Sequence, residues 1–254
     1  MAVNADSIIE VSDLLARYGE ATILQDVSFT VPRGKIFVII GASGCGKSTL
    51  MRHMIGLDRA RSGSVKIDGD ELYASETRYR EVQRKIGVLF QNSALFGSMT
   101  LAENIALPIS EYTQLPPSAV DQLVRMKLCM VDLSGFEAHL PSEISGGMKK
   151  RAALARAMAL NPKILFLDEP TSGLDPVISA EIDHLIRHIN RSLGTTMVIV
   201  THDLGSIMSI ADQAIMLDKG RRGIVAEGEP RSLRDHSENP EVRRFFQRKA
   251  RSDS

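Results

Sequence analysis

The sequence predicts an α/β fold built on a largely parallel sheet. Strand and helix patterns alternate along the chain, which is typical of parallel strands joined by crossover helices. Three apolar runs are too short to favour a helix and have the composition of buried strands. They are residues 35–40 (KIFVII), 163–168 (KILFLD) and 196–201 (TMVIVT).

Composition places the chain among soluble globular proteins. It has 254 residues, of which 43% are apolar and 24% charged. Lys+Arg and Asp+Glu are 31 each, so the zero net charge favours neither a nucleic-acid partner nor an acidic tail. Two Cys indicate a reducing compartment rather than a disulfide framework. The N-terminus lacks the features of a signal peptide, and no apolar run approaches the roughly 20 residues of a bilayer span.

The clearest helix is predicted after Asp175. This residue is a suitable N-cap, Pro176 suits the first helical position, and Gly194 suits the end. The apolar face expected to be buried consists of Ile178, Ile182, Leu185, Ile186, Ile189 and Leu193.

The remaining segments predict two additions to this core within a single domain, residues 1–254. Residues 8–32 and 62–72 have the pattern of short strands with turns, so we expect a small antiparallel sheet beside the core. Residues 92–160 have helical patterns without a strand signal and are interpreted as an inserted helical subdomain. Residues 241–254 predict a short amphipathic helix followed by a basic tail.

A phosphate-binding loop is indicated by residues 41–49, GASGCGKST. Its glycines let the backbone N–H groups approach a phosphate, and the following helix presents its positive end to the anion. Lys47 would lie between the β- and γ-phosphates, and Ser48 would bind Mg²⁺. The core is therefore predicted to be that of a P-loop nucleoside triphosphatase. The residues expected to contact the nucleotide are Gly41, Ala42, Ser43, Gly44, Cys45, Gly46, Lys47, Ser48 and Thr49.

Two further strands end in polar residues. Asp168 would hold Mg²⁺ directly or through water, and Glu169 would polarise a water for in-line attack. Without the phosphate loop, a solvated strand end with two acids would be the better interpretation. His202 follows the third strand and could reach the γ-phosphate.

A second helix start has the same physical character as the phosphate loop. Ser145, Gly146 and Gly147 precede an Ala-rich helix, so its first N–H groups are expected to be free of any bulky cap. One ATP has only one γ-phosphate. The second helix start is therefore expected to serve a different nucleotide.

The motifs GASGCGKST, ISGGM, ILFLDE, SGLD and THD, in this order, resemble the nucleotide-binding subunit of an ABC transporter over nearly the whole chain. The resemblance implies a head-to-tail dimer in which two copies sandwich each ATP. It also implies that Tyr18 stacks on adenine, that Gln91 lies near Mg²⁺ and the attacking water, and that Leu174 and Asp175 cross to the other copy. Residues 92–105 would meet the cytoplasmic helix of a permease.

One position departs from the usual pattern, because Met148 follows the glycine pair where Gln is usual. Met cannot donate a hydrogen bond to a nucleotide. The sequence SGGMKKRAALARA followed by DEPTSGLDPV resembles the Mla-type ATPases of bacterial phospholipid transport. That resemblance implies a permease, a lipid-binding protein of the mammalian-cell-entry type, a small STAS-domain protein and a peripheral location on the cytoplasmic face of the inner membrane.

Two alternatives remain open at this point. The same fold could power import of a polar solute or release of lipoproteins. The second alternative is a non-transport ABC ATPase that acts on DNA or the ribosome. Such ATPases usually carry coiled coils, paired nucleotide domains or a basic surface.

Overall fold

A computed structural model describes residues 6–247 of the chain. They form two compact units. One contains the chain up to Gln83 and again from Thr196, and the other runs from Arg84 to Thr195.

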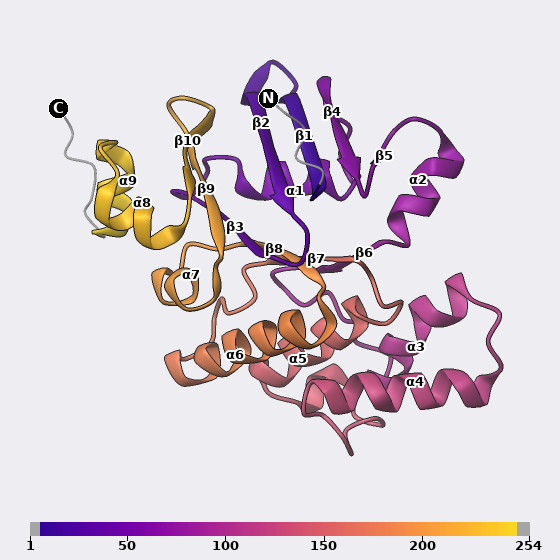
Figure 1. The fold of residues 1–254 in the computed structure, drawn as a ribbon. Helices are drawn as coiled ribbons and strands as arrows, with labels where there is room; N and C mark the ends of the chain where they lie inside the picture. The colour runs from indigo at the N-terminus through magenta and orange to yellow at the C-terminus, as the bar shows by residue number, and fades with distance from the viewer. Residues whose placement is uncertain (1–5, 248–254) are drawn as a thin grey trace. The chain divides into compact units, whose positions relative to one another are not determined.

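The first unit contains the predicted antiparallel sheet, with strand order β2-β1-β4-β5. Its strands are β1 (Ser7–Tyr18), β2 (Ala21–Pro32), β4 (Ser62–Ile67) and β5 (Asp70–Glu71). Figure 1 shows β1, β2 and β4 beside one another. The prediction of short strands was wrong for β1 and β2, which are 12 residues each. Both strands pass through left-handed aspartates, Asp13 and Asp26, and their pairing continues across register shifts.

Parallel strands form the second layer of this unit. β3 (Ile36–Ile40) pairs parallel with β8 (Thr196–Val200) and with β9 (Gln213–Asp218), and β10 (Gly223–Gly228) pairs antiparallel with β9. Every residue of β3 and β8 is buried, as expected for strands covered on both faces. Phe29 of β2 stacks on Phe37 of β3 with ring centroids 5.6 Å apart, which connects the two layers.

Five helices belong to this unit within the described residues. They are α1 (Lys47–Met54), α2 (Glu76–Gln83), α7 (Leu204–Ile210), α8 (Pro230–His236) and α9 (Pro240–Phe246). α9 confirms the helix expected near the C-terminus, whereas the expected basic tail after Gln247 lies outside the described residues.

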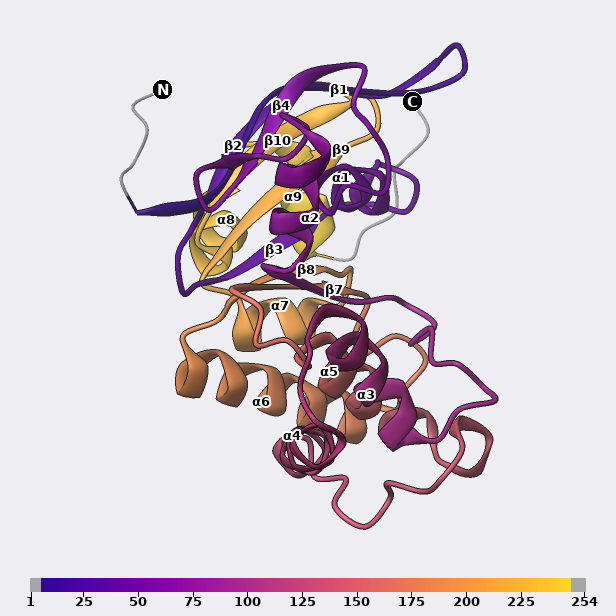
Figure 2. The same ribbon diagram turned by 90° about the vertical axis from the view of Figure 1, so that its right-hand side faces the viewer.

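The second unit has two parallel strands, β6 (Ile86–Leu89) and β7 (Ile164–Asp168). Its helices are α3 (Leu101–Tyr112), α4 (Pro117–Met130), the 3₁₀ turn η1 (Pro141–Glu143), α5 (Gly146–Ala157) and α6 (Pro176–Leu193). α3, α4 and α5 lie within the region interpreted as helical from the sequence, and Figure 2 shows them together.

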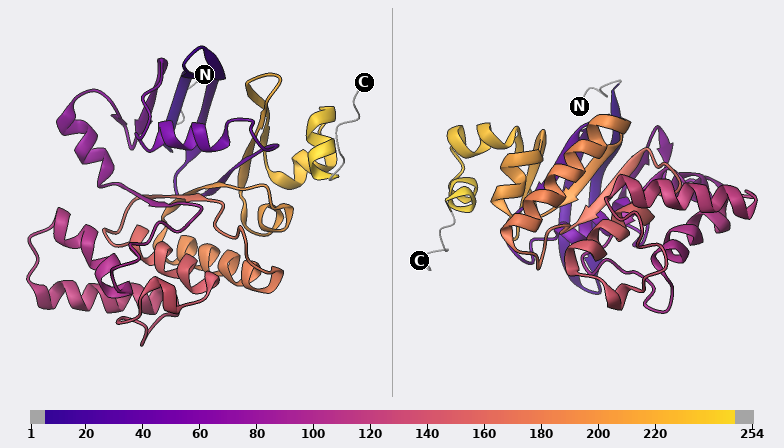
Figure 3. Two further views of the ribbon diagram at one scale, coloured as in Figure 1. Left: turned by 180° about the vertical axis from the view of Figure 1, so that it is seen from behind. Right: turned by 90° about the horizontal axis from the view of Figure 1, so that it is seen from below.

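α6 confirms the predicted caps. Asp175 accepts hydrogen bonds from the N–H groups of Val177 and Ile178, and Gly194 ends the helix with φ 65°. The predicted burial of Leu193 was wrong, because this side chain at the last helical position is 50% exposed. α5 and α6 pack against each other within this unit (Figure 3). No helix within residues 6–247 has the length and apolar content needed to cross a bilayer.

Candidate functional site

The loop between β3 and α1 has a backbone that requires glycine. Gly41 has φ 144°, and a β-carbon there would lie 2.4 Å from the carbonyl oxygen of Leu217. Gly46 has φ 102°, and a β-carbon there would lie 2.7 Å from Cδ2 of Leu24. α1 starts directly after Gly46 without a side-chain cap, so its positive end is open. This geometry fits a bound phosphate.

The side chain of Lys47 contacts the same loop. Its Nζ donates to the carbonyl oxygens of Gly41 at 2.9 Å and Ala42 at 3.1 Å, and the side chain is buried. Ser43 and Ser48 are exposed. The ammonium group is thus held at the loop by two acceptors that an incoming phosphate oxygen can replace.

His202 lies at the same sheet edge as the phosphate loop. β3 and β8 are parallel and in register, with Ile39 opposite Val200. The chain leaves both strands at their carboxyl ends, where open α/β sheets bind ligands. His202 is exposed there, directly before Asp203, which caps α7 through the N–H of Gly205.

Tyr18 at the end of β1 is attached to α1 by a polar network. Its hydroxyl donates to Oδ2 of Asp58 at 2.7 Å, and Asp58 also accepts from Arg52 Nε at 2.7 Å. This bond to Asp58 raises the pKa of Tyr18, so the phenol stays neutral. The ring remains 50% exposed. The aromatic face is available for stacking while the hydroxyl fixes the position of the ring.

In the second unit, Gln91, Asp168 and Glu169 lie at one sheet edge. β6 and β7 are parallel with Leu89 opposite Leu167, so the residues that follow them leave the sheet together. Gln91 is exposed, and its Nε2 lies 3.5 Å from Oγ of Ser172. Glu169 is 9% exposed and has a left-handed backbone with φ 47°.

Lys150 of α5 joins these two strand ends. Its Nζ donates to the carbonyl oxygen of Gln91 at 2.5 Å and to that of Glu169 at 3.1 Å. Burial lowers the pKa of Lys150, and the nearby carboxylates of Asp168 and Glu169 oppose this shift. The lysine is therefore buried and held by two main-chain carbonyl oxygens, and the two carboxylates favour its charged form.

The start of α5 carries a small cap. The first N–H groups were expected to be free of any bulky cap, and the hydroxyl of Ser145 accepts a hydrogen bond from the N–H of Met148 at 3.3 Å. Ser145 is thus the N-cap of α5. Ser145 and Gly146 are exposed, whereas Gly147 is buried against α6.

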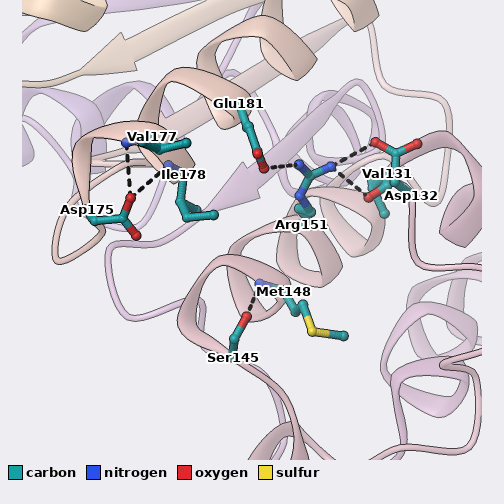
Figure 4. A network of polar contacts seen from close by, with 9 residues as sticks. All are labelled: Val131, Asp132, Ser145, Met148, Arg151, Asp175, Val177, Ile178 and Glu181. Atoms are coloured by element: carbon teal, nitrogen blue, oxygen red, sulfur yellow. Dashed lines mark hydrogen bonds and ion pairs between the residues drawn. The ribbon is translucent and has the colours of Figure 1, made fainter.

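Farther along α5, Arg151 anchors the helix to its neighbours. It forms ion pairs with Asp132 at 2.8 Å and Glu181 at 3.1 Å, and it donates to the carbonyl oxygen of Val131 (Figure 4). The helix that Ser145 caps therefore has a fixed position within its unit.

The predicted site residues thus fall into two sets. The first unit brings together the phosphate loop and His202 at one sheet edge and connects Tyr18 to α1. The second unit brings together Gln91, Asp168 and Glu169. The assembly of both sets around one nucleotide stays a prediction.

Comparison with known proteins decides the family. The ABC transporter family profile matches residues 24–172 of this chain. The chain belongs to the ABC transporter family. This result confirms the resemblance drawn from the motifs and the predicted α/β fold class.

Individual ABC transporter proteins are similar over most of the chain. The intermembrane phospholipid transport system ATP-binding protein MlaF of Escherichia coli is 41% identical over 97% of this chain and 91% of its own length. The probable ribonucleotide transport ATP-binding protein mkl of Mycobacterium tuberculosis is 44% identical over 94% of this chain. The chain spans 66% of the length of that mycobacterial relative.

Solved ABC transporter structures have the same fold. A dimeric ATP-binding cassette in a post-hydrolysis state, bound to ADP and Pi, gives a TM-score of 0.78 with 30% sequence identity. The match covers 87% of this chain and 98% of that one. The dimeric state of that structure supports the dimer expected here.

Sequence reasoning missed the residues that hold the site residues in place. Lys150 was visible only as one of two adjacent lysines, yet it lies on the stripe of α5 that also buries Gly147 and Leu154. A charged residue on a buried helical stripe is a usable signal, because such a group needs specific partners. The sequence around Asp58 has no comparable feature that would have predicted its contact with Tyr18.

Proposed function

We propose that this chain is the ATP-hydrolysing subunit of a bacterial ABC transporter that moves phospholipid between the inner membrane and the cell envelope. The likeness to MlaF carries this proposal, since it extends over 97% of this chain and 91% of that protein. The name of mkl refers to probable ribonucleotide transport, so nucleotide transport is a second candidate, with weaker support because the chain covers 66% of that protein.

Nucleotide binding is assigned to the first set of residues. The N–H groups of residues 41–49 and the ammonium group of Lys47 bind the phosphates, and the exposed ring of Tyr18 stacks on adenine. The open start of α1 supports this assignment.

Hydrolysis is assigned to Glu169, with Gln91 and His202 in supporting roles. Glu169 accepts a proton from the attacking water, Gln91 orients that water, and His202 donates a hydrogen bond to the γ-phosphate. The hydroxyl of Ser48, the amide oxygen of Gln91 and the carboxylate of Asp168 form an all-oxygen donor set that suits Mg²⁺. The bound ion would neutralise charge on the transferred phosphoryl group.

A second copy of the chain completes each site in this proposal. Ser145, Gly146 and Gly147 of one copy face the γ-phosphate held by the other, with N–H groups at the start of α5 as donors. The Ser145 hydroxyl can accept from Met148 and still donate its own proton to a phosphate. Met148 adds no side-chain hydrogen bond.

The partners follow from the same proposal. A transmembrane permease responds to the movement of the two ATP-binding copies. A lipid-binding protein of the mammalian-cell-entry type and a STAS-domain protein complete the transporter. The chain would then be a single domain lying peripherally on the cytoplasmic face of the inner membrane.

Two substitutions test the chemistry in the purified transporter. Glu169→Gln should bind ATP normally but hydrolyse it at least about tenfold more slowly, because the base is removed. Lys47→Ala should weaken ATP binding at least about tenfold, because the charge at the phosphates is lost. Glu76→Gln on an exposed face is the control and should change neither quantity. Unchanged turnover in Glu169→Gln removes Glu169 from the base role.

The cargo is tested with the complete transporter in detergent micelles, to which phospholipid or a ribonucleotide monophosphate is added. Hydrolysis should rise on addition of phospholipid and should not respond to the ribonucleotide monophosphate. Stimulation by the ribonucleotide alone would favour the second candidate.

A further inference from the structure

The buried ammonium group of Lys150 connects two loops that the proposed function uses separately. One loop leaves β6 and carries Gln91, and the other leaves β7 and carries Glu169. Lys150 is 6% exposed, and its ammonium group donates to the main-chain carbonyl oxygens of those two residues. A hydrogen bond from a cation to a carbonyl is stronger than a neutral one, particularly away from water.

The Glu169 end of this connection needs support from its surroundings. Its backbone is left-handed, with φ 47°, a conformation that residues with a β-carbon adopt only where their surroundings hold it. The carbonyl oxygen of Glu169 accepts from Lys150 at 3.1 Å and from the N–H of Ser172 at 3.1 Å. These two donors fix the peptide plane from which the Glu169 side chain projects.

The Gln91 end is held by α5 as well. Arg156, six residues after Lys150 on the same helix, donates to the carbonyl oxygens of Ser93 at 3.0 Å and Ala94 at 2.7 Å. Both residues have left-handed backbones. Arg156 therefore holds the loop that follows Gln91, whereas Lys150 contacts both that loop and Glu169. Because of this difference, a substitution of Arg156 is a matched comparison for a substitution of Lys150.

We propose that Lys150 is a positioning residue that couples the Gln91 loop to Glu169. Displacement of the Gln91 loop moves one acceptor of the ammonium group, and the shared donor passes that displacement to the peptide that orients Glu169. The inference rests on the proposed function, in which Gln91 and Glu169 act at the nucleotide. Lys150 itself contacts main-chain atoms and takes no part in proton transfer.

Three single variants of the full transporter test this coupling. Lys150→Met removes the charge and the donors at similar length, Lys150→Arg keeps both, and Lys149→Met changes the adjacent, partly exposed lysine. We expect Lys150→Met to lower kcat at least about tenfold with the KM for ATP within about threefold, because misplaced catalytic groups lose rate rather than binding. Lys150→Arg should recover most of kcat, and Lys149→Met should match the parent.

A double variant separates positioning from general damage to the fold. In the Glu169→Gln background, Lys150→Met should lower the remaining turnover by less than about twofold, because the group it positions is already inactive. Arg156→Met should lower kcat in the parent and should again lower it when Lys150 is Met, since Arg156 holds a different part of the Gln91 loop.

The outcomes distinguish this inference from the proposed function. If Glu169→Gln is slow but Lys150→Met turns over like the parent, the inference is wrong and the proposed function stands. The inference is also wrong if Lys150→Met lowers kcat by the same factor in the parent and in the Glu169→Gln background. Normal turnover in Glu169→Gln overturns both. Should Lys150→Met not fold, Lys150→Gln, which keeps an uncharged donor, must still lower kcat for the inference to hold.

Discussion

Gly147 lies so close to Ile178 that a β-carbon added to the glycine would come within 2.7 Å of Cγ2 of Ile178. This contact sets the approach of α5 to α6. Gly146 is different, because a β-carbon there would lie 3.4 Å from Cδ2 of Leu174, an ordinary contact distance. The two neighbouring glycines therefore have different physical roles.

Gly147→Ala should destabilise the protein, and Gly146→Ala should not. Forcing an extra methyl group into a packed contact costs about 1–3 kcal/mol. For a chain of this size, that corresponds to a fall in Tm of about 2–12 °C. Thermal unfolding followed by circular dichroism measures both variants. Equal Tm values for the two would mean that the α5–α6 contact relaxes without cost.

Asp58→Ala should weaken ATP binding even though the proposed nucleotide contacts are unchanged. Asp58 accepts from the Tyr18 hydroxyl, and without that bond the half-exposed ring loses its fixed position. Tyr18→Ala should lose about tenfold in affinity, within the range of aromatic–base stacking, and Asp58→Ala should lose less. Titration calorimetry with ATP measures the order of the losses. Glu20→Ala is the nearby control, and a loss there equal to that of Asp58→Ala would contradict the role of Asp58.

The same carboxylate predicts a pH dependence of stability. Hydrogen bonds from Arg52, and then from Tyr18, lower the pKa of Asp58 from 3.8 to about 2. Because the folded pKa lies below the unfolded one, the stabilisation is present above about pH 4 and is lost as pH falls through about 2. The free energy of unfolding of Asp58→Asn should therefore lie below that of the parent at pH 5, and the gap should shrink toward pH 2. A gap that stays constant over this range would show that ionised Asp58 contributes nothing.

The sequence predicted those parts of the fold and site that depend on local pattern. The phosphate loop was visible because its glycines and Lys47 stand in a fixed spacing after a strand. α6 was visible because Asp175, Pro176 and Gly194 each suit one helical position. In such cases the residues that decide the structure are close together in the sequence.

Contacts between distant residues were beyond this kind of reasoning. Lys150 is 59 residues from Gln91 and 19 from Glu169, and its partners are main-chain carbonyls that every sequence contains. Tyr18 and Asp58 are 40 residues apart. The wrong prediction of burial for Leu193 had a different cause. The apolar periodicity of α6 continues to Leu193, but the neighbouring structure no longer covers the helix at that position.

The two thiols should react at very different rates. Cys129 on α4 is exposed, whereas Cys45 in the phosphate loop is 2% exposed and burial raises its pKa. Since the thiolate is the reactive form, both effects protect Cys45. The native protein should take up a maleimide label quickly at Cys129 and slowly at Cys45, while Cys129→Ser should show only the slow reaction. Mass spectrometry over time measures the two rates. Labelled Cys129 should leave ATP binding intact because it lies on α4, away from the phosphate loop in the sequence, and fast labelling of Cys129→Ser would show that the phosphate loop opens in solution.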